Sequence, residues 1–277
     1  MSTASLKEDR MKASTFNRLR ELIYDRSGIT LGTNKESLVK ARLSKRMRKL
    51  GIDRYEAYLD LVINDKTGLE MQDLLDAIST NVTSFYREPE HFEFMKTVIK
   101  ERTKSGVNHL RVWSAACSSG EEPYTLAIEI MEAIGGKPSD VKILATDIAP
   151  SVLKTGLKGE YSQEKIASVP RHLQAKYFTK KEAQGKCVHT ISDRARDLVL
   201  FRQFNLNTFP YPIRGPLDFI FCRNVMIYFD RPIRARIVNE FSRLLRPGGY
   251  LFLGHAESLA GISEGYKSIK PSIHMKE

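Results

Sequence analysis

The sequence predicts an α/β protein in two parts, an all-helical N-terminal domain at residues 1–80 and a doubly wound α/β domain at residues 81–277. Up to about residue 80, apolar side chains recur only at helical spacing. From Leu110 onward, short apolar runs typical of strands alternate with helical segments. This alternation indicates a parallel sheet with helices on both faces. A chain of 277 residues is long enough for both domains.

Helical periodicity predicts four helices in the N-terminal domain. The first two end at Gly28 and Gly51, because glycine commonly terminates a helix. The third and fourth lie at about residues 55–62 and 69–78.

The α/β domain contains strand-like runs separated by helical segments. The runs lie at about residues 110–116, 141–147, 198–205, 217–223 and 250–257. Helices are expected at 121–134, after Pro150 and at about 231–245. Between Tyr177 and Leu200, a polar stretch with Gly185 at a hairpin tip predicts a small antiparallel β insertion at about residues 177–200.

Composition and charge restrict the classes of protein that the chain can belong to. The net charge of +11 suggests an acidic partner, which could be nucleic acid, an anionic membrane or a carboxylate-rich protein. No apolar run approaches the roughly 18 residues needed to span a bilayer, and the N-terminus lacks the apolar core of a signal peptide. We therefore expect a cytoplasmic protein with no integral membrane segment.

The cysteines and histidines do not form a metal-binding or disulfide pattern. Cys117, Cys187 and Cys222 are odd in number and have no CxxC spacing. The six histidines form no HExxH or comparable motif. We expect neither a disulfide framework nor a metal site.

The first strand of the α/β domain ends in a run of small residues from Ser114 to Gly120 and leads directly into a helix. Small residues let a ligand approach the backbone closely, so the turn is a candidate site for a nucleotide-like ligand. The alternative is a tight strand-to-helix turn without a ligand, because only Gly120 remains of a GxGxxG pattern.

Asp147 ends the second strand, where a doubly wound fold places an acidic residue that accepts hydrogen bonds from ribose hydroxyls. The alternative is that Asp147 caps the helix after Pro150. Together with the small-residue turn, it favours an adenosine-type cofactor.

Glu121 and Glu122 begin the helix after the turn and indicate which cofactor binds. Carboxylates at this helix terminus would repel a pyrophosphate. S-adenosylmethionine carries a sulfonium and an ammonium and no phosphate, so an acid would attract it. Glu121 is the ligand candidate because it lies closer to the turn, although either acid could simply complement the helix dipole.

Six segments carry a family resemblance. They are STNVTSFYRE at 79–88, VWSAACSSGEEPYTLA at 112–127, ATDI at 145–148, FNL at 204–206, FCRNVMIYF at 221–229 and LLRPGGYLFLGHAES at 244–258. In this order they closely resemble the chemotaxis-receptor glutamate methyltransferases of the CheR type, over nearly the whole chain. The resemblance implies a class I S-adenosylmethionine-dependent methyltransferase, with a Rossmann-like doubly wound sheet. Its implied reaction is methyl transfer from S-adenosylmethionine to glutamate side chains of a chemoreceptor, which leaves S-adenosylhomocysteine.

The same resemblance implies roles for individual residues. The implied cofactor-binding residues are Asn81, Thr83, Arg87, Glu121 (methionine part), Asp147 (ribose), Asn205 and Leu206 (adenine), and Arg223 and Asn224. Arg87 and Tyr228 would lie closest to the transferred methyl group and act in catalysis. The alternatives are a surface salt bridge of Arg87 with Glu88 or Glu90 and plain core packing for Tyr228.

The chemistry of the implied reaction agrees with these residue types. A glutamate carboxylate is ionised at neutral pH and is itself the nucleophile, so no dedicated general base is needed. Catalysis should depend mainly on aligning the carboxylate oxygen with the methyl carbon and the sulfur, and on removing water from the carboxylate. Orienting donors such as Arg87 and Tyr228 suit this task.

Much of the excess positive charge lies between residues 35 and 54, a segment that contains eight basic residues and only two acidic ones. Arg42, Arg46, Arg48 and Lys49 are the candidate docking residues for an acidic receptor helix. The alternative is an ordinary solvated helix face. No aromatic residues of the kind expected for single-stranded nucleic acid are interleaved with these charges.

Two other functions stay open. A nucleic-acid methyltransferase is the alternative enzyme, although Arg223 and Asn224 stand where base methylation usually employs Asn or Asp followed by Pro-Pro and an aromatic. A non-catalytic adaptor that binds the cofactor as a signal is the alternative outside the enzyme class. We expect a monomer that is recruited to membrane receptor arrays and does not bind nucleic acid.

Overall fold

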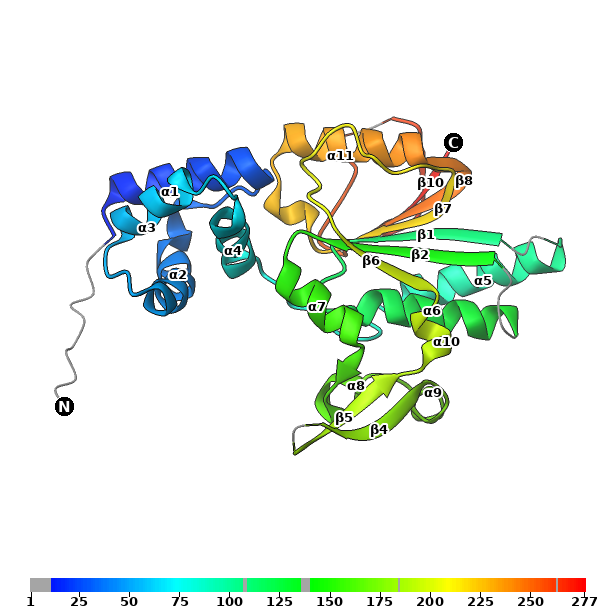
Figure 1. Ribbon diagram of the computed structural model, residues 1–277. Helices are drawn as coiled ribbons and strands as arrows, with labels where there is room; N and C mark the ends of the chain where they lie inside the picture. The colour runs from blue at the N-terminus through cyan, green and yellow to red at the C-terminus, as the bar shows by residue number, and fades with distance from the viewer. Residues whose placement is uncertain (1–10, 107–108, 136–139, 184, 263) are drawn as a thin grey trace. The chain divides into compact units, whose positions relative to one another are not determined.

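The computed structural model describes residues 11–106, 109–135, 140–183, 185–262 and 264–277. The chain divides into two compact units. The first comprises the residues up to Thr80 together with Tyr228–Asp230, and the second comprises Asn81–Ile227 and Arg231–Glu277. Figure 1 shows the elements of each unit.

The described part of the first unit contains four α-helices and one short 3-10 helix. They are α1 (Ala13–Ser27), η1 (Thr33–Lys35), α2 (Glu36–Leu50), α3 (Tyr55–Asn64) and α4 (Leu69–Ile78). The predicted ends at Gly28 and Gly51 are confirmed, and both glycines adopt the left-handed conformation that closes a helix. The apolar stripes of these helices form a core that includes Leu19, Leu43 and Leu74.

Residues Tyr228–Asp230 return from the later part of the chain to the helical unit. The Thr30 amide donates a hydrogen bond of 2.8 Å to the Tyr228 carbonyl. The Tyr24 hydroxyl donates one of 2.7 Å to Asp230. A division at residue 80 alone therefore leaves out part of the helical unit.

The second unit is built on a seven-stranded sheet in the order β6-β2-β1-β7-β8-β10-β9. Its strands are β1 (His109–Ala115), β2 (Asp140–Asp147), β6 (Val199–Gln203), β7 (Leu217–Cys222), β8 (Leu245–Leu253), β9 (Tyr266–Lys270) and β10 (Ile273–Lys276). The first five strands in this order are parallel, and β10 pairs antiparallel with both β8 and β9. The predicted doubly wound α/β fold is confirmed, with an antiparallel edge that the sequence did not predict.

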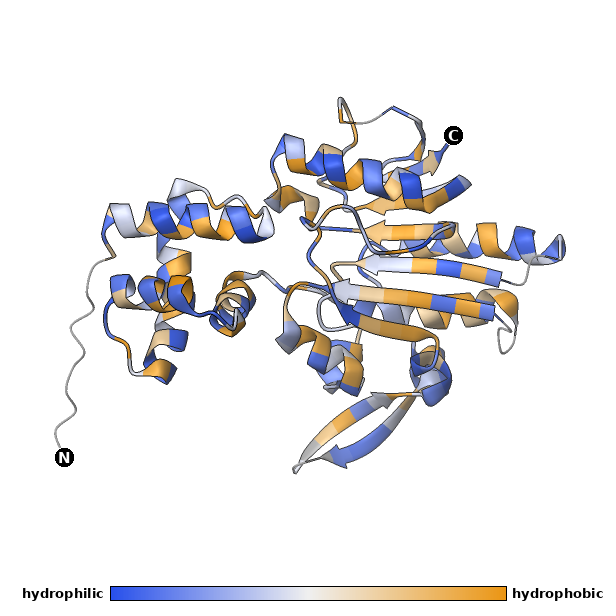
Figure 2. Ribbon diagram, turned by 45° about the horizontal axis from the view of Figure 1, so that its top comes forward, coloured by the Kyte–Doolittle hydropathy of each residue, from blue (hydrophilic) through white to orange (hydrophobic). Residues whose placement is uncertain are grey.

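Helices cover both faces of this sheet. Helix α11 (Arg231–Leu244) lies on one face, and α5 (Glu90–Lys104) and α6 (Glu121–Ile134) lie on the other (Figure 1). Trp113 packs edge-on against Phe241 of α11, whereas Phe92 of α5 stacks on Phe221 of β7. Figure 2 shows hydrophobic residues over the central part of the sheet, which both layers bury.

The predicted β insertion forms a separate three-stranded antiparallel sheet in the order β3-β5-β4. It contains β3 (Glu160–Tyr161), β4 (Phe178–Ala183) and β5 (Lys186–Ile191). Four short helices surround it or lead into it, α7 (Pro150–Lys158), α8 (Gln163–Ile166), α9 (Arg171–Tyr177) and α10 (Asp193–Arg196). The apolar run after the insertion joins the main sheet as β6, because it pairs in parallel with β2.

Candidate functional site

Strained backbone marks one end of the main sheet. Of the six described non-glycine residues with a left-handed φ, five lie in this region, at Tyr86, Glu88, Ala116, Ser118 and Asn224. Ala116 and Ser118 follow β1, and Asn224 follows β7. Such conformations are costly and cluster at functional sites. This is also the edge at which a doubly wound sheet binds ligands.

The turn after β1 admits only glycine at its last position. Gly120 has a φ of 94° and immediately precedes α6. A Cβ atom there would lie 2.9 Å from the Gly156 Cα atom and 2.9 Å from the Tyr161 hydroxyl oxygen. The small residue thus permits a close approach between the turn and the following βα unit.

Asp147 holds this turn in place. Its carboxylate accepts a hydrogen bond of 2.8 Å from the Ser118 amide and one of 3.0 Å from the Ala149 amide, and the residue is 6% exposed. The second bond lies beside the start of α7, while the first reaches across to the turn after β1. Carboxylate oxygens each accept more than one hydrogen bond, which is the property that recognition of ribose hydroxyls requires.

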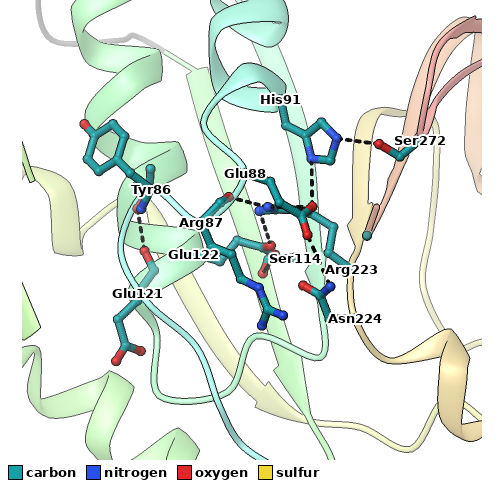
Figure 3. A network of polar contacts seen from close by, with 12 residues as sticks. Tyr86, Arg87, Glu88, His91, Ser114, Glu121, Glu122, Arg223, Asn224 and Ser272 are labelled. Carbon is teal, nitrogen blue, oxygen red and sulfur yellow. Dashed lines mark hydrogen bonds and ion pairs between the residues drawn. The ribbon is translucent and has the colours of Figure 1, made fainter. Parts of the chain in front are cut away.

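Glu121 and Glu122 turn their carboxylates to different sides of α6. Glu121 is fully buried and accepts hydrogen bonds of 2.7 Å each from Lys165 Nζ and Ser119 Oγ. In Figure 3 its carboxylate points away from the cluster around Glu122. Protein groups therefore occupy the Glu121 carboxylate, which the sequence analysis assigned to the cofactor.

Glu122 belongs to a buried polar cluster at the ends of β1 and β7. It accepts a hydrogen bond of 2.6 Å from Ser114 Oγ and one of 3.0 Å from Arg223 Nη1. Burial raises the pKa of Glu122, although the Arg223 charge opposes the shift.

Arg223 is the centre of this cluster. Its side chain is 1% exposed and forms ion pairs with Glu122 at 3.0 Å and Glu88 at 3.1 Å. It also donates to the Arg87 carbonyl. The guanidinium is thus occupied by protein groups, which leaves the main chain of Arg223 as the part that can contact a cofactor.

Asn224 follows directly in a left-handed conformation with a φ of 59°. Its amide donates to Glu257 Oε2 at 2.9 Å, and its side-chain Nδ2 donates to Glu88 Oε1 at 3.3 Å. Glu257 also accepts a hydrogen bond of 2.6 Å from the Gly254 amide. Glu88 and Glu257, which the sequence analysis did not select, therefore fix the end of β7 from two sides.

The segment that contains Asn81, Thr83 and Arg87 lies against the turn after β1. Ser118 Oγ donates a hydrogen bond of 3.1 Å to the Asn81 carbonyl. Arg87 donates to the Val82 carbonyl at 3.0 Å and takes part in none of the ion pairs recorded among the described residues. The alternative for Arg87, a surface salt bridge with Glu88 or Glu90, is accordingly not formed. Its guanidinium points away from His91 in Figure 3.

Asn205 and Leu206 follow β6, next to the end of β2. The Phe204 amide donates to the Asp147 carbonyl at 2.9 Å, which ties the two segments together. Leu206 is 6% exposed, and its carbonyl accepts from the Tyr211 hydroxyl at 2.8 Å. Asn205 Oδ1 accepts from the Asn207 amide at 2.9 Å. The structure therefore brings these two residues to the same sheet edge as Asp147.

Tyr228 and the basic docking residues belong to the first unit. The place of Tyr228 beside Arg87 stays a prediction. Arg42 donates to the carbonyl of Ser79 at 3.1 Å and to Ile78, and Arg46 donates to Glu70 at 2.9 Å. Arg48 and Lys49 are exposed, and so is Lys45. Only half of the four proposed docking residues thus present their charge to solvent.

The structure brings together two histidines and a glutamate that no sequence motif had predicted to be close. Potential ligand atoms of Glu88, His91 and His255 lie within 4.8 Å of one another, although His91 and His255 are far apart in the sequence. Burial, together with the nearby Arg223 charge, lowers the pKa of His91 to about 4. Glu88 also forms an ion pair with Arg223, at 3.1 Å. That the chain binds no metal stays a prediction.

Both units match models of one protein family, and the chain is similar to known proteins over most of its length. Residues 81–274 match a family model described as the SAM-binding domain of CheR methyltransferases, and residues 14–79 match the all-alpha domain of the same family. Chemotaxis protein methyltransferase 2 of Pseudomonas aeruginosa is 37% identical over 259 residues, which cover 94% of this chain and 91% of that protein. The chemotaxis protein methyltransferase of Escherichia coli is 36% identical over 252 residues, which cover 91% and 86%. No helix within the described ranges is long and apolar enough to cross a membrane.

Proposed function

The chain belongs to the CheR methyltransferase family, and we propose that it transfers a methyl group from S-adenosylmethionine to glutamate side chains of chemotaxis receptors. The products would be glutamate methyl esters and S-adenosylhomocysteine. The observation that carries the proposal is the Asp147-held turn after β1, which lies within the matched SAM-binding domain.

The residues at this sheet edge fit an adenosine-containing cofactor. Asp147 offers carboxylate lone pairs to ribose hydroxyls, and Asn205 and Leu206 lie beside it for the adenine. The main chain between Ser118 and Gly120 allows close approach. When bound, the cofactor supplies a methyl group on a positively charged sulfur.

The carboxylates near the site favour a cation. The charges of Glu121 and Glu122 lie at the start of α6, although Lys165 and Arg223 balance them in part. A dinucleotide pyrophosphate would gain nothing from these acids, whereas a ligand with a sulfonium and an ammonium is attracted to them.

The substrate carboxylate is the nucleophile, so the residues of this chain have to orient it rather than remove a proton from it. Arg87 suits this task because, among the described residues, the hydrogen bond of its guanidinium goes to a main-chain carbonyl, at Val82, and not to a carboxylate. We assign Arg87 to orientation of the glutamate carboxylate, with Tyr228 as its predicted partner. Loss of either should reduce turnover more than stability.

The exposed basic residues of α2 are proposed to bind the acidic receptor. Lys45, Arg48 and Lys49 present their charges to solvent and would recruit the enzyme to receptor arrays. Arg42 and Arg46 would contribute indirectly, because their hydrogen bonds join α2 to α4.

The test is transfer of labelled methyl from S-adenosylmethionine to receptor-containing membranes, followed by release of the label in mild base. Base-labile label on receptor glutamates is expected, with Arg87→Ala as a variant that should lose turnover. Label on DNA instead of receptor would replace the proposal with the nucleic-acid alternative. Tight cofactor binding without any transfer would favour the adaptor.

A further inference from the structure

We propose that Glu88 is a positioning residue that orients the end of β7 for cofactor binding, an inference that rests on the proposed function. Glu88 precedes α5, while the groups that it binds follow β7, more than 130 positions later in the chain. Its carboxylate links the Arg87 segment to that strand end, beside the hydrogen bond from Arg223 to the Arg87 carbonyl.

The side-chain hydrogen bonds to Glu88 come from two consecutive residues, and the His255 main-chain amide is a further donor at 3.5 Å. Its Oε2 atom accepts from Arg223 Nη2 at 3.1 Å and from Arg223 Nε at 3.3 Å. Its Oε1 atom accepts from Asn224 Nδ2 at 3.3 Å. One carboxylate thus holds both side chains at once, and Figure 3 shows it between His91 and Asn224.

A carboxylate can only accept hydrogen bonds, and this property fixes the orientation of the Asn224 amide. The NH₂ group must face Glu88, so the carbonyl oxygen Oδ1 faces away from it. The space around the side-chain amide is small, since a Cβ atom at Gly254 would overlap Asn224 Nδ2 and lie 2.9 Å from the Asn224 main-chain nitrogen. A glutamine at position 88 could donate or accept, and the Asn224 amide would lose its unique orientation.

The charge of Glu88 is maintained by its surroundings. Burial opposes ionisation, but Arg223 and the Asn224 hydrogen bond outweigh it and lower the pKa of Glu88. Arg223 has a second partner in Glu122, at 3.0 Å. Replacement of Glu88 by glutamine therefore leaves the buried guanidinium with one carboxylate, which should allow the variant to fold.

The left-handed conformation of Glu88 supports a functional role. Its φ of 54° is unfavourable for a non-glycine residue. The neighbouring Tyr86 and the bound Asn224 share this conformation. Glu88 and its partner Asn224 are thus both strained, as expected where the surrounding structure imposes a site geometry.

The chain offers a matched control on the same strand. Asp218 lies near the start of β7, is 2% exposed and binds Arg102 at 2.6 Å and Arg246 at 2.7 Å. Glu88→Gln and Asp218→Asn each remove the charge of a carboxylate that pairs with arginine, which is Arg223 in the first case and Arg102 and Arg246 in the second. Only the first change affects the strand end where the cofactor would bind.

The experiment measures S-adenosylhomocysteine affinity by calorimetry and unfolding by the fluorescence of Trp113, the only tryptophan in the chain. Both variants should be less stable than wild type. We expect Glu88→Gln to weaken the ligand about tenfold to a hundredfold, the size of effect caused by small displacements of positioning groups. Asp218→Asn should keep wild-type affinity. Equal affinities for the two variants would overturn the proposal.

A double-mutant cycle tests whether Glu88 acts through Asn224. In the Asn224→Ala background, Glu88→Gln should have a clearly smaller effect on affinity, because the amide that it orients is gone. Fully additive effects would contradict a positioning role. Failure of the wild-type protein to bind S-adenosylhomocysteine would instead refute the proposed function, so the two failures are distinguishable.

Discussion

Asp147 should stabilise the methyltransferase unit through its two main-chain hydrogen bonds, and Asp147→Ala tests this directly. The change leaves the Ser118 and Ala149 amides without their acceptor in a buried position. A hydrogen bond to a charged group is worth about 1.5–3 kcal/mol, so we expect a loss of about 3–6 kcal/mol in the free energy of unfolding. This is a large share of the roughly 5–15 kcal/mol by which proteins of this kind are stable.

Asp140 is the control because it lies at the other end of the same strand. Its carboxylate is 50% exposed and pairs with Arg111 at 2.8 Å. Exposed ion pairs contribute about 0–1 kcal/mol, so Asp140→Ala should have little effect. Asp147→Asn retains one acceptor oxygen and should fall between the two.

Urea unfolding followed by Trp113 fluorescence measures these differences in the free energy of unfolding. Trp113 reports on the second structural unit, which also contains Asp147 and Asp140. Trp113 is fully buried, and its indole nitrogen donates a hydrogen bond of 2.9 Å to Thr146, next to Asp147. Equal unfolding free energies of Asp147→Ala and Asp140→Ala would refute the stabilising role of Asp147. Asp147→Ala should also weaken S-adenosylhomocysteine by about 1–3 kcal/mol if the carboxylate binds the ribose.

Three further predictions follow from other contacts. Gly254→Ala would place a Cβ atom against Asn224 Nδ2 and 2.9 Å from the Asn224 main-chain nitrogen, so the affinity for S-adenosylhomocysteine should fall. Gly106→Ala, whose Cβ atom would meet nothing within 4 Å, should keep that affinity, and equal affinities of the two variants would argue against this packing. His91 has a folded pKa of about 4 and an ordinary value of 6.5, so the unfolded chain binds its proton first as pH falls. Stability should rise by up to roughly 3 kcal/mol as pH increases from 4 to 6.5 and then level off, and His91→Phe should abolish that part of a urea-unfolding pH series. Replacement of the exposed residues Lys45, Arg48 and Lys49 by alanine should raise the KM for receptor and weaken the dependence of this KM on salt. The affinity for the cofactor should stay unchanged. An unaltered KM would indicate that these residues form an ordinary solvated face.

The sequence by itself determined the elements whose signals are local. Helical periodicity followed by glycine located the ends of α1 and α2, and the helix predicted at 121–134 is α6 without change. Such elements are specified by residues within a few turns of one another. The motifs that carry the family resemblance also lie within short segments, and the family membership that they implied is confirmed.

Tertiary structure decided the features that depend on distant segments. The pairing of β10 with β8, the inclusion of β3 in the small sheet and the return of Tyr228–Asp230 to the helical unit have no local signal. The partners of charged side chains could not be predicted either, because the sequence does not reveal which carboxylate pairs with a buried guanidinium. The sequence predicted Arg223 and Glu121 as cofactor contacts, which stays a prediction, but it did not predict that Glu122, Glu88 and Lys165 pair with their charged groups. A charged group that is removed from water must find its partner within the fold, and the fold alone determines which partner that is.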